Sequence, residues 1–229
     1  MILTRRAALA GGLSAVGAGL LPGAGFAASP RGAGERAFDV LRGGTRIGHH
    51  LTRVRRDGDA LTVETDIDLV VRVLGIAAYR YRLESREVWE GGALVSLDSF
   101  ANDDGDEDRA QVRRTAEGLI SEGTHRGPLP ELVATTTYWT PAFLDRPVWL
   151  STQTGAPLDV TPRRIGTETV ATAGGEVQAT AWRSEGDLPV TMFYDEAGEW
   201  VGNAFDAGGT EARFVLTAGA APLAGLWQA

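Results

Sequence analysis

The chain has 229 residues, of which 22 are basic, 30 are acidic and 3 are histidine, so its formal net charge is −8 at pH 7. An acidic chain is a poor partner for nucleic acid or an anionic membrane surface, both of which attract basic patches. The chain has no cysteine, which excludes disulfides, thiolate nucleophiles, thiolate metal ligands and a lipid-modified cysteine.

Residues 1–27 have the pattern of an export signal peptide. Arg5 and Arg6 precede a weakly apolar stretch rich in Ala, Gly and Leu, and small residues lie around Ala27. The pattern resembles a twin-arginine signal, which the export machinery recognises and which is then removed. The alternative is a permanent transmembrane helix, but the stretch barely reaches the ~20 residues that span a bilayer. We expect cleavage near Ala27, no stable membrane insertion afterwards, and a soluble periplasmic or secreted protein.

Two long strands are the clearest elements that follow. Apolar and polar residues alternate from Leu61 to Val73, and the alternation resumes from Tyr79 to Glu90 after a break at Gly75. A period of two indicates strands with one buried face.

Turn signals recur along the chain at Gly43-Gly44, Asp57-Gly58, Gly91-Gly92 and Asp104-Gly105, among others. Such pairs supply the positive φ of tight hairpins, and no long segment has helical periodicity. The pattern predicts one all-β domain at 36–217, a single strongly bent antiparallel meander of nine to eleven strands that forms a half-barrel or open barrel. A disordered linker at 28–35 and a flexible tail at 218–229 would flank it.

The segment 125–160 interrupts this meander. Its five prolines prevent a central strand of ordinary length, and it holds at most one or two short helices. Long ordered connections are more often functional than short ones. The segment is therefore either a lid over a binding site or a structural plug.

The polar residues predict no metal site and no cofactor. The acidic run 102–108 lacks the first acid of a calcium loop, because Phe100 occupies that position, and a hairpin tip at Asp104-Gly105 explains the same residues. His49 and His50 are neighbours in a strand, so they point to opposite faces.

Glu87 is the polar residue that breaks an apolar pattern, because it shares a strand face with Tyr79, Tyr81 and Trp89. Burial would raise its pKa, as in a general acid, although structural ion pairs look similar. No nucleophile motif, phosphate loop or second catalytic group accompanies it. We therefore favour a protein without catalytic activity, and keep as a third alternative a hydrolase or isomerase that uses Glu87 as general acid or base.

Four motifs resemble a family of exported bacterial proteins known only as a domain of unknown function. They are FDVLRGGTRIGHH, YRYRLESREVWEGGALVSLDS, TTTYWTPAFL with STQTG, and FYDEAGEWVGNAFDAGGTEARFVL, and they cover roughly residues 36–217. The last third is also similar to a second uncharacterised exported family. Both look like relatives of lipoprotein-carrier proteins, which implies a bent sheet around an apolar groove but no particular activity.

The leading hypothesis is an exported protein that binds or carries a lipid or other hydrophobic molecule in the groove of a curved sheet. Glu87 would add a polar contact to this groove. Six aromatic residues would line it: Tyr79, Tyr81, Trp89, Tyr138, Trp139 and Phe143. The same aromatics could instead fill the core. A cell-envelope protein-interaction module, with an exposed apolar patch or free sheet edge, is the main alternative. The oligomeric state stays open.

Overall fold

The computed structural model describes residues 32–219 and 222–227. The predicted signal peptide at 1–27 lies outside the described residues, as do residues 28–31 of the predicted linker. Residues 33–35 of that linker already belong to the first strand. The strands of the first half are β1 (Ala33–Arg42), β2 (Thr45–Asp57), β3 (Ala60–Val73), β4 (Ile76–Glu90), β5 (Ala93–Asp103), β6 (Asp106–Asp108), β7 (Gln111–Thr115), β8 (Gly118–Glu122) and β9 (Arg126–Leu129).

A short irregular region follows, with β10 (Val133–Thr135), the 3-10 helix η1 (Pro141–Asp145), β11 (Val148–Leu150) and β12 (Pro157–Leu158). The second half of the chain contains β13 (Val160–Thr172), β14 (Gly175–Gly186), β15 (Val190–Asp195), β16 (Trp200–Asp206), β17 (Glu211–Gly219) and the 3-10 helix η2 (Ala224–Leu226). The described chain therefore holds 17 strands, more than the nine to eleven expected, because several are only two to five residues long.

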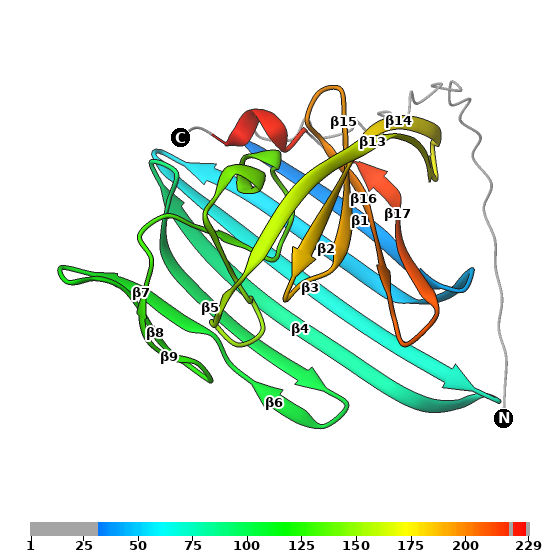
Figure 1. The fold of residues 1–229 in the computed structure, drawn as a ribbon, viewed down its shortest axis with the longest axis horizontal. Helices are drawn as coiled ribbons and strands as arrows, with labels where there is room; N and C mark the ends of the chain where they lie inside the picture. Colours follow the sequence, from blue (N-terminus) through cyan, green and yellow to red (C-terminus); the bar gives the residue numbers. More distant parts are fainter. Residues whose placement is uncertain (1–31, 220–221, 228–229) are drawn as a thin grey trace, which may run out of the picture.

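One antiparallel sheet contains 14 of these strands, and it confirms the predicted all-β fold. Its order is β13-β14-β15-β16-β17-β1-β2-β3-β4-β5-β7-β8-β9, with β6 paired to β5. The path does not return to its start, so the sheet is open. Figure 1 shows the strands of its second half crossing in front of β1–β5, with the 125–160 region between them.

Alternating side chains place the core on the inner side of this sheet. In β4 every second residue from Leu83 to Trp89 is buried, whereas Glu84 and Arg86 are exposed. The same alternation holds in β3, where Leu61 and Val63 are buried. Burial of one face of each strand gives the main core, which also includes side chains of the 125–160 region.

The 125–160 region contains a small three-stranded sheet in which β10 and β11 are parallel and β11 and β12 are antiparallel. Its one short helix, η1, begins after Thr140, whose side chain accepts a hydrogen bond from Ala142 N–H. Pro141 occupies the first turn of η1, where its missing N–H has no consequence. The region thus has short elements only, as its prolines predicted.

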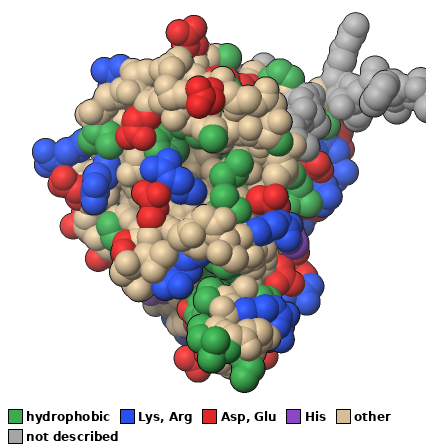
Figure 2. All heavy atoms as spheres, turned by 90° about the vertical axis from the view of Figure 1, so that its right-hand side faces the viewer, with side chains coloured by type: hydrophobic (Ala, Val, Ile, Leu, Met, Phe, Trp, Pro, Cys, Tyr) green, Lys and Arg blue, Asp and Glu red, His purple; other side chains and the backbone are tan. Residues whose placement is uncertain are grey.

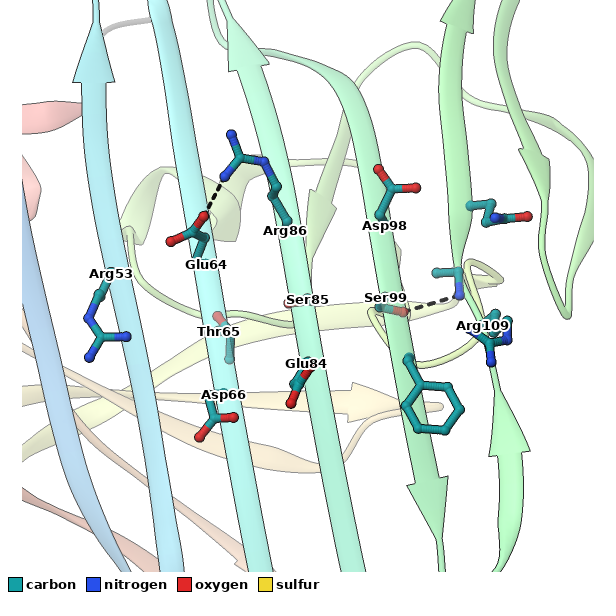
Figure 3. Close-up of a pocket in the computed structure, with 13 residues that line it drawn as sticks. Arg53, Glu64, Thr65, Asp66, Glu84, Ser85, Arg86, Asp98, Ser99 and Arg109 are labelled. Atoms are coloured by element: carbon teal, nitrogen blue, oxygen red, sulfur yellow. Dashed lines mark hydrogen bonds and ion pairs between the residues drawn. The ribbon is translucent and has the colours of Figure 1, made fainter.

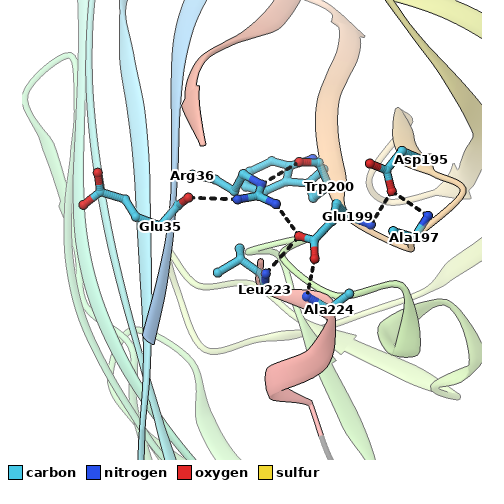
Figure 4. A network of polar contacts seen from close by, with 8 residues as sticks. All are labelled: Glu35, Arg36, Asp195, Ala197, Glu199, Trp200, Leu223 and Ala224. Atoms are coloured by element: carbon cyan, nitrogen blue, oxygen red, sulfur yellow. Dashed lines mark hydrogen bonds and ion pairs between the residues drawn. The ribbon is translucent and has the colours of Figure 1, made fainter. Parts of the chain in front are cut away.

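The C-terminal segment 222–227 packs on the sheet, in contrast to the flexible tail predicted from residue 218. Figure 4 shows the carboxylate of Glu199 held by three groups. It forms a buried ion pair with Arg36, and it accepts hydrogen bonds from the N–H groups of Leu223 at 2.9 Å and Ala224 at 3.0 Å. Leu223 is fully buried. A buried charge pair therefore fixes the end of the described chain.

No helix among the described residues is long and apolar enough to cross a membrane.

Candidate functional site

A groove lies on the inner side of the curled sheet, between its two halves and the 125–160 region. Its volume is about 410 Å³, which falls within the ~300–1,000 Å³ typical of small-molecule sites. Most of the lining is apolar, with contributions from β3, β12, β16, β17 and the β14–β15 turn: Ile67, Leu69, Leu158, Leu188, Phe205 and Phe214. The groove is therefore a place where an apolar molecule could replace water.

Three of the seven residues predicted to line a site lie in this groove: Tyr79, Tyr81 and Tyr138. The hydroxyl of Tyr81 donates to Gln153 Oε1 at 3.4 Å, and Gln153 Nε2 donates to Asp108 Oδ2 at 2.8 Å. Burial, with smaller contributions from nearby acidic residues, raises the pKa of both Tyr79 and Tyr81 above the usual range. Both phenols are thus neutral hydrogen-bonding groups at physiological pH.

Tyr138 connects the 125–160 region to the groove through an unusual backbone conformation. Its φ is +59°, a value that non-glycine residues rarely adopt and that often accompanies functional sites. Its carbonyl oxygen accepts a hydrogen bond from the hydroxyl of Tyr194 at 2.8 Å, and this bond is buried. The neighbouring Thr136 and Thr152 share a hydroxyl contact of 2.8 Å and also line the groove.

His50 and Asn203 add two buried polar groups to the groove wall, each about 1% exposed. His50 Nε2 lies 3.1 Å from Thr52 Oγ1, and Asn203 Oδ1 accepts from Trp200 Nε1 at 2.9 Å. Among the described residues, His50 Nδ1 and Asn203 Nδ2 have no hydrogen-bond partner. An unpaired buried polar group costs about 1–3 kcal/mol, so a ligand oxygen that bonded to either nitrogen would remove that cost.

Burial also lowers the pKa of His50 to about 3, with a smaller contribution from His49. The imidazole is therefore neutral above that pH and can act as donor or acceptor according to its tautomer. His49, by contrast, faces outward and pairs with Asp66 at 2.7 Å, so the two histidines point to opposite faces as predicted.

The sequence pattern did not mark His50 or Asn203 as site residues. A signal for His50 existed, because His50, Thr52 and Val54 have the same parity in β2, and Val54 indicates the buried face. No comparable signal marked Asn203. It lies within five consecutive buried residues of β16, Trp200–Ala204, where alternation gives no information.

The other four predicted residues lie apart from the groove, in a packed cluster. Trp89, Trp139 and Phe143 are at most 1% exposed. The ring of Trp227 lies 5.4 Å from that of Trp89 and 5.5 Å from those of Trp139 and Phe143. The C-terminal segment thus closes this cluster, and these aromatics act as core. The 125–160 region is therefore a plug at Trp139 and Phe143 and a groove wall at Tyr138.

Glu87 lies in the same packed region and is 0% exposed. Its Oε2 accepts a hydrogen bond from Trp89 Nε1 at 2.8 Å. Desolvation raises the pKa of Glu87 to about 7, and the nearby Trp89, Thr135 and Thr137 oppose this shift in part. Because Glu87 does not line the groove, its geometry fits a buried structural acid.

A second, shallow depression of about 530 Å³ lies on the outer face of β3–β5. Figure 3 shows charged side chains across these strands, including the ion pair between Arg86 and Glu64. Asp98 pairs with Arg113 in the same way. Both pairs are about half exposed, which is typical of a solvated sheet face. Within the described residues no group of three or more His, Cys, Asp or Glu could hold a metal.

Comparisons with known proteins agree with this architecture. The model of a domain of unknown function, DUF6134, matches residues 38–217. Among solved structures, the chain is similar to a β-barrel-like protein of the domain of unknown function DUF1849 from Brucella abortus. The TM-score is 0.59 at 9% identity, and the match covers 82% of this chain and 97% of that one. No curated protein matches. At that identity the structural match concerns the fold alone.

Proposed function

We propose a binding function from the premise that the chain belongs to the DUF6134 family, whose function is unknown. The inner groove binds a small hydrophobic molecule, such as a lipid, that carries at least one hydrogen-bonding oxygen. The observation that supports this most directly is a groove of about 410 Å³ whose lining is mainly apolar. We also propose that the protein acts after export, as the pattern around Arg5 and Arg6 suggests.

The division between groove and core supports this proposal. Large side chains fill the space around Trp89 and Trp139, so this part of the interior between the sheet and the 125–160 region is packed. The groove is not filled in this way, and its lining includes His50 and Asn203, each of which has a buried side-chain nitrogen without a hydrogen-bond partner among the described residues. An apolar groove with few polar groups is the usual form of a lipid or small-molecule site.

A fluorescent fatty acid, dansyl-undecanoic acid, tests the proposal. Wild-type protein should bind it saturably. Leu69→Trp, which places a larger side chain in the groove, should weaken binding about tenfold or more, since overpacking costs about 1–3 kcal/mol. Leu158→Trp tests the same volume from β12. Leu132→Trp is the matched control, because Leu132 is 54% exposed and outside the groove.

Thermal unfolding of each variant would establish that it is folded. If the wild type shows no saturable binding, or if both groove variants bind as well as Leu132→Trp, the groove is not the site. Native mass spectrometry of protein purified from its own host would then identify the class of any ligand carried by the wild type.

A further inference from the structure

The hairpin between β3 and β4 extends beyond the rest of the sheet. Pairing of β2 with β3 ends at Leu69, and pairing of β4 with β5 ends at Tyr81. Residues 70–80, here called the β3–β4 finger, are therefore paired mainly with each other. At the base, the backbone of Arg80 still bonds to Asp104. Figure 1 shows this hairpin projecting at the lower right, past the neighbouring hairpins.

The end of the finger is apolar and exposed. Val73 is 57% exposed, Leu74 is 98% exposed and Ile76 is 74% exposed. Among the described residues, the other exposed large apolar side chains are Leu132, in the connection before β10, and Ile165, on β13. In Figure 2 hydrophobic and basic side chains gather on the lobe at the lower end of the view, where this hairpin projects. Apolar groups concentrated at one exposed point indicate an interaction surface.

The turn itself supports a role beyond folding. Leu74 has φ +51° and Gly75 has φ +82°, a combination that normally favours Asn-Gly or Asp-Gly. Other hairpins of this sheet use Gly43-Gly44, Gly91-Gly92 and Asp104-Gly105 at their tips. A leucine in this position is unfavourable for the backbone and gains no internal packing. Neither folding nor solubility explains its presence.

The charge of the finger is opposite to that of the whole chain. Its sequence, VVRVLGIAAYR, contains Arg72 and Arg80 and no acidic residue, in a chain with formal net charge −8. Both arginines are exposed. The ion pairs found among the described residues include neither of them. An apolar tip with basic residues behind it is complementary to an anionic phospholipid surface, where apolar groups insert and each Arg adds attraction.

We propose that the β3–β4 finger docks the protein on phospholipid bilayers that contain anionic lipids. Leu74, Val73 and Ile76 enter the interface, and Arg72 and Arg80 contact the headgroups. A second copy of the chain fits less well, because two such fingers carry like charge.

The finger is continuous with the inner groove. Tyr79 belongs to the finger and also lines the groove, and Leu69 and Tyr81 continue the groove lining from its base. Docking would therefore place the groove next to the bilayer, so that an apolar ligand could pass between them. This route depends on the proposed binding function, whereas docking itself does not.

Sedimentation with vesicles tests docking. The full mature chain is mixed with phosphatidylcholine vesicles that contain or lack phosphatidylglycerol. Wild-type protein should sediment with the mixed vesicles. Leu74→Ser should weaken this partitioning about tenfold or more, because transfer of one leucine from water is worth about that factor. Ile165→Ser is the matched control, since Ile165 is another exposed large apolar residue, 52% exposed, but lies on β13, and it should bind as the wild type does.

A second variant tests the charge. Arg72→Gln with Arg80→Gln should lower binding to the anionic vesicles about tenfold or more and leave binding to phosphatidylcholine alone unchanged. Equal vesicle binding by wild type and Leu74→Ser overturns the proposal. So does a dimer in sedimentation velocity that Leu74→Ser abolishes. Dansyl-undecanoic acid binding by Leu74→Ser in solution should be unchanged, so failure of docking and failure of the groove give different results.

Discussion

Glu87 makes a prediction about stability that depends on pH in a defined way. Its carboxyl is fully buried, and burial raises its pKa from 4.5 to about 7. We consider Glu87→Gln, which keeps the size and shape of the side chain but cannot ionise. The amide oxygen of the new side chain can still accept the hydrogen bond from Trp89 Nε1.

The sign of the effect follows from the direction of the shift. A raised pKa means that the folded protein holds the proton more tightly than the unfolded chain does. Below pH 4.5 Glu87 is protonated in both the folded and the unfolded protein, so its ionisation does not lower the free energy of unfolding. As pH rises from 4.5 through about 7, the wild type loses stability relative to the variant. A difference of about 2.5 pKa units corresponds to about 3 kcal/mol.

Urea unfolding followed by tryptophan fluorescence measures this difference, because the chain has six tryptophans. The free energies of unfolding of wild type and Glu87→Gln should converge below pH 4.5. Above pH 7 the variant should be more stable by up to about 3 kcal/mol. Titration of all other groups cancels in the comparison. A difference that stays constant from acid to neutral pH, or a variant that is less stable above pH 7, would refute the assigned environment of Glu87.

Two further substitutions test the packed region. Glu199→Ala should cost about 3–5 kcal/mol, because it leaves the Arg36 charge buried, and hydrogen exchange at the amides of Leu223 and Ala224 should become faster. Trp139→Ala should cost about 3–5 kcal/mol in urea unfolding, as expected for a large core side chain. Tyr79→Ala, at the half-buried groove wall, should cost clearly less, and equal costs would contradict the separation of groove from core.

The sequence was sufficient to predict the fold class. Alternation in 61–73 and 79–90, with glycine turns between strands, specified an antiparallel sheet, and the 14-stranded sheet confirms it. The number of strands was underestimated because elements such as β6 and β12 have two or three residues, too few for a periodic signal. The sheet order could not be derived either, since pairing of β1 with β17 depends on contacts distant in sequence.

The candidate site was predicted only in part, for a physical reason. Parity along a strand identifies the inner face, so Tyr79, Tyr81, Glu87 and Trp89 were correctly assigned to one side. Parity does not indicate what packs against each position. The C-terminal Trp227 contacts Trp89 at one end of that face, whereas the other end faces the groove. The division of this strand face into packed core and groove therefore depends on the C-terminal segment 222–227, whose sequence has no pattern that predicts ordered packing.

The position of β1 within the sheet also determines when the molecule can fold. β1 lies between β2, its neighbour in sequence, and β17, at residues 211–219. During synthesis one edge of β1 therefore has no partner until β17 has left the ribosome. Pairing of strands so distant in sequence forms more slowly than a local hairpin does. The nascent chain accordingly exposes a long unpaired strand edge for most of its synthesis, which makes protection by a chaperone useful during that period.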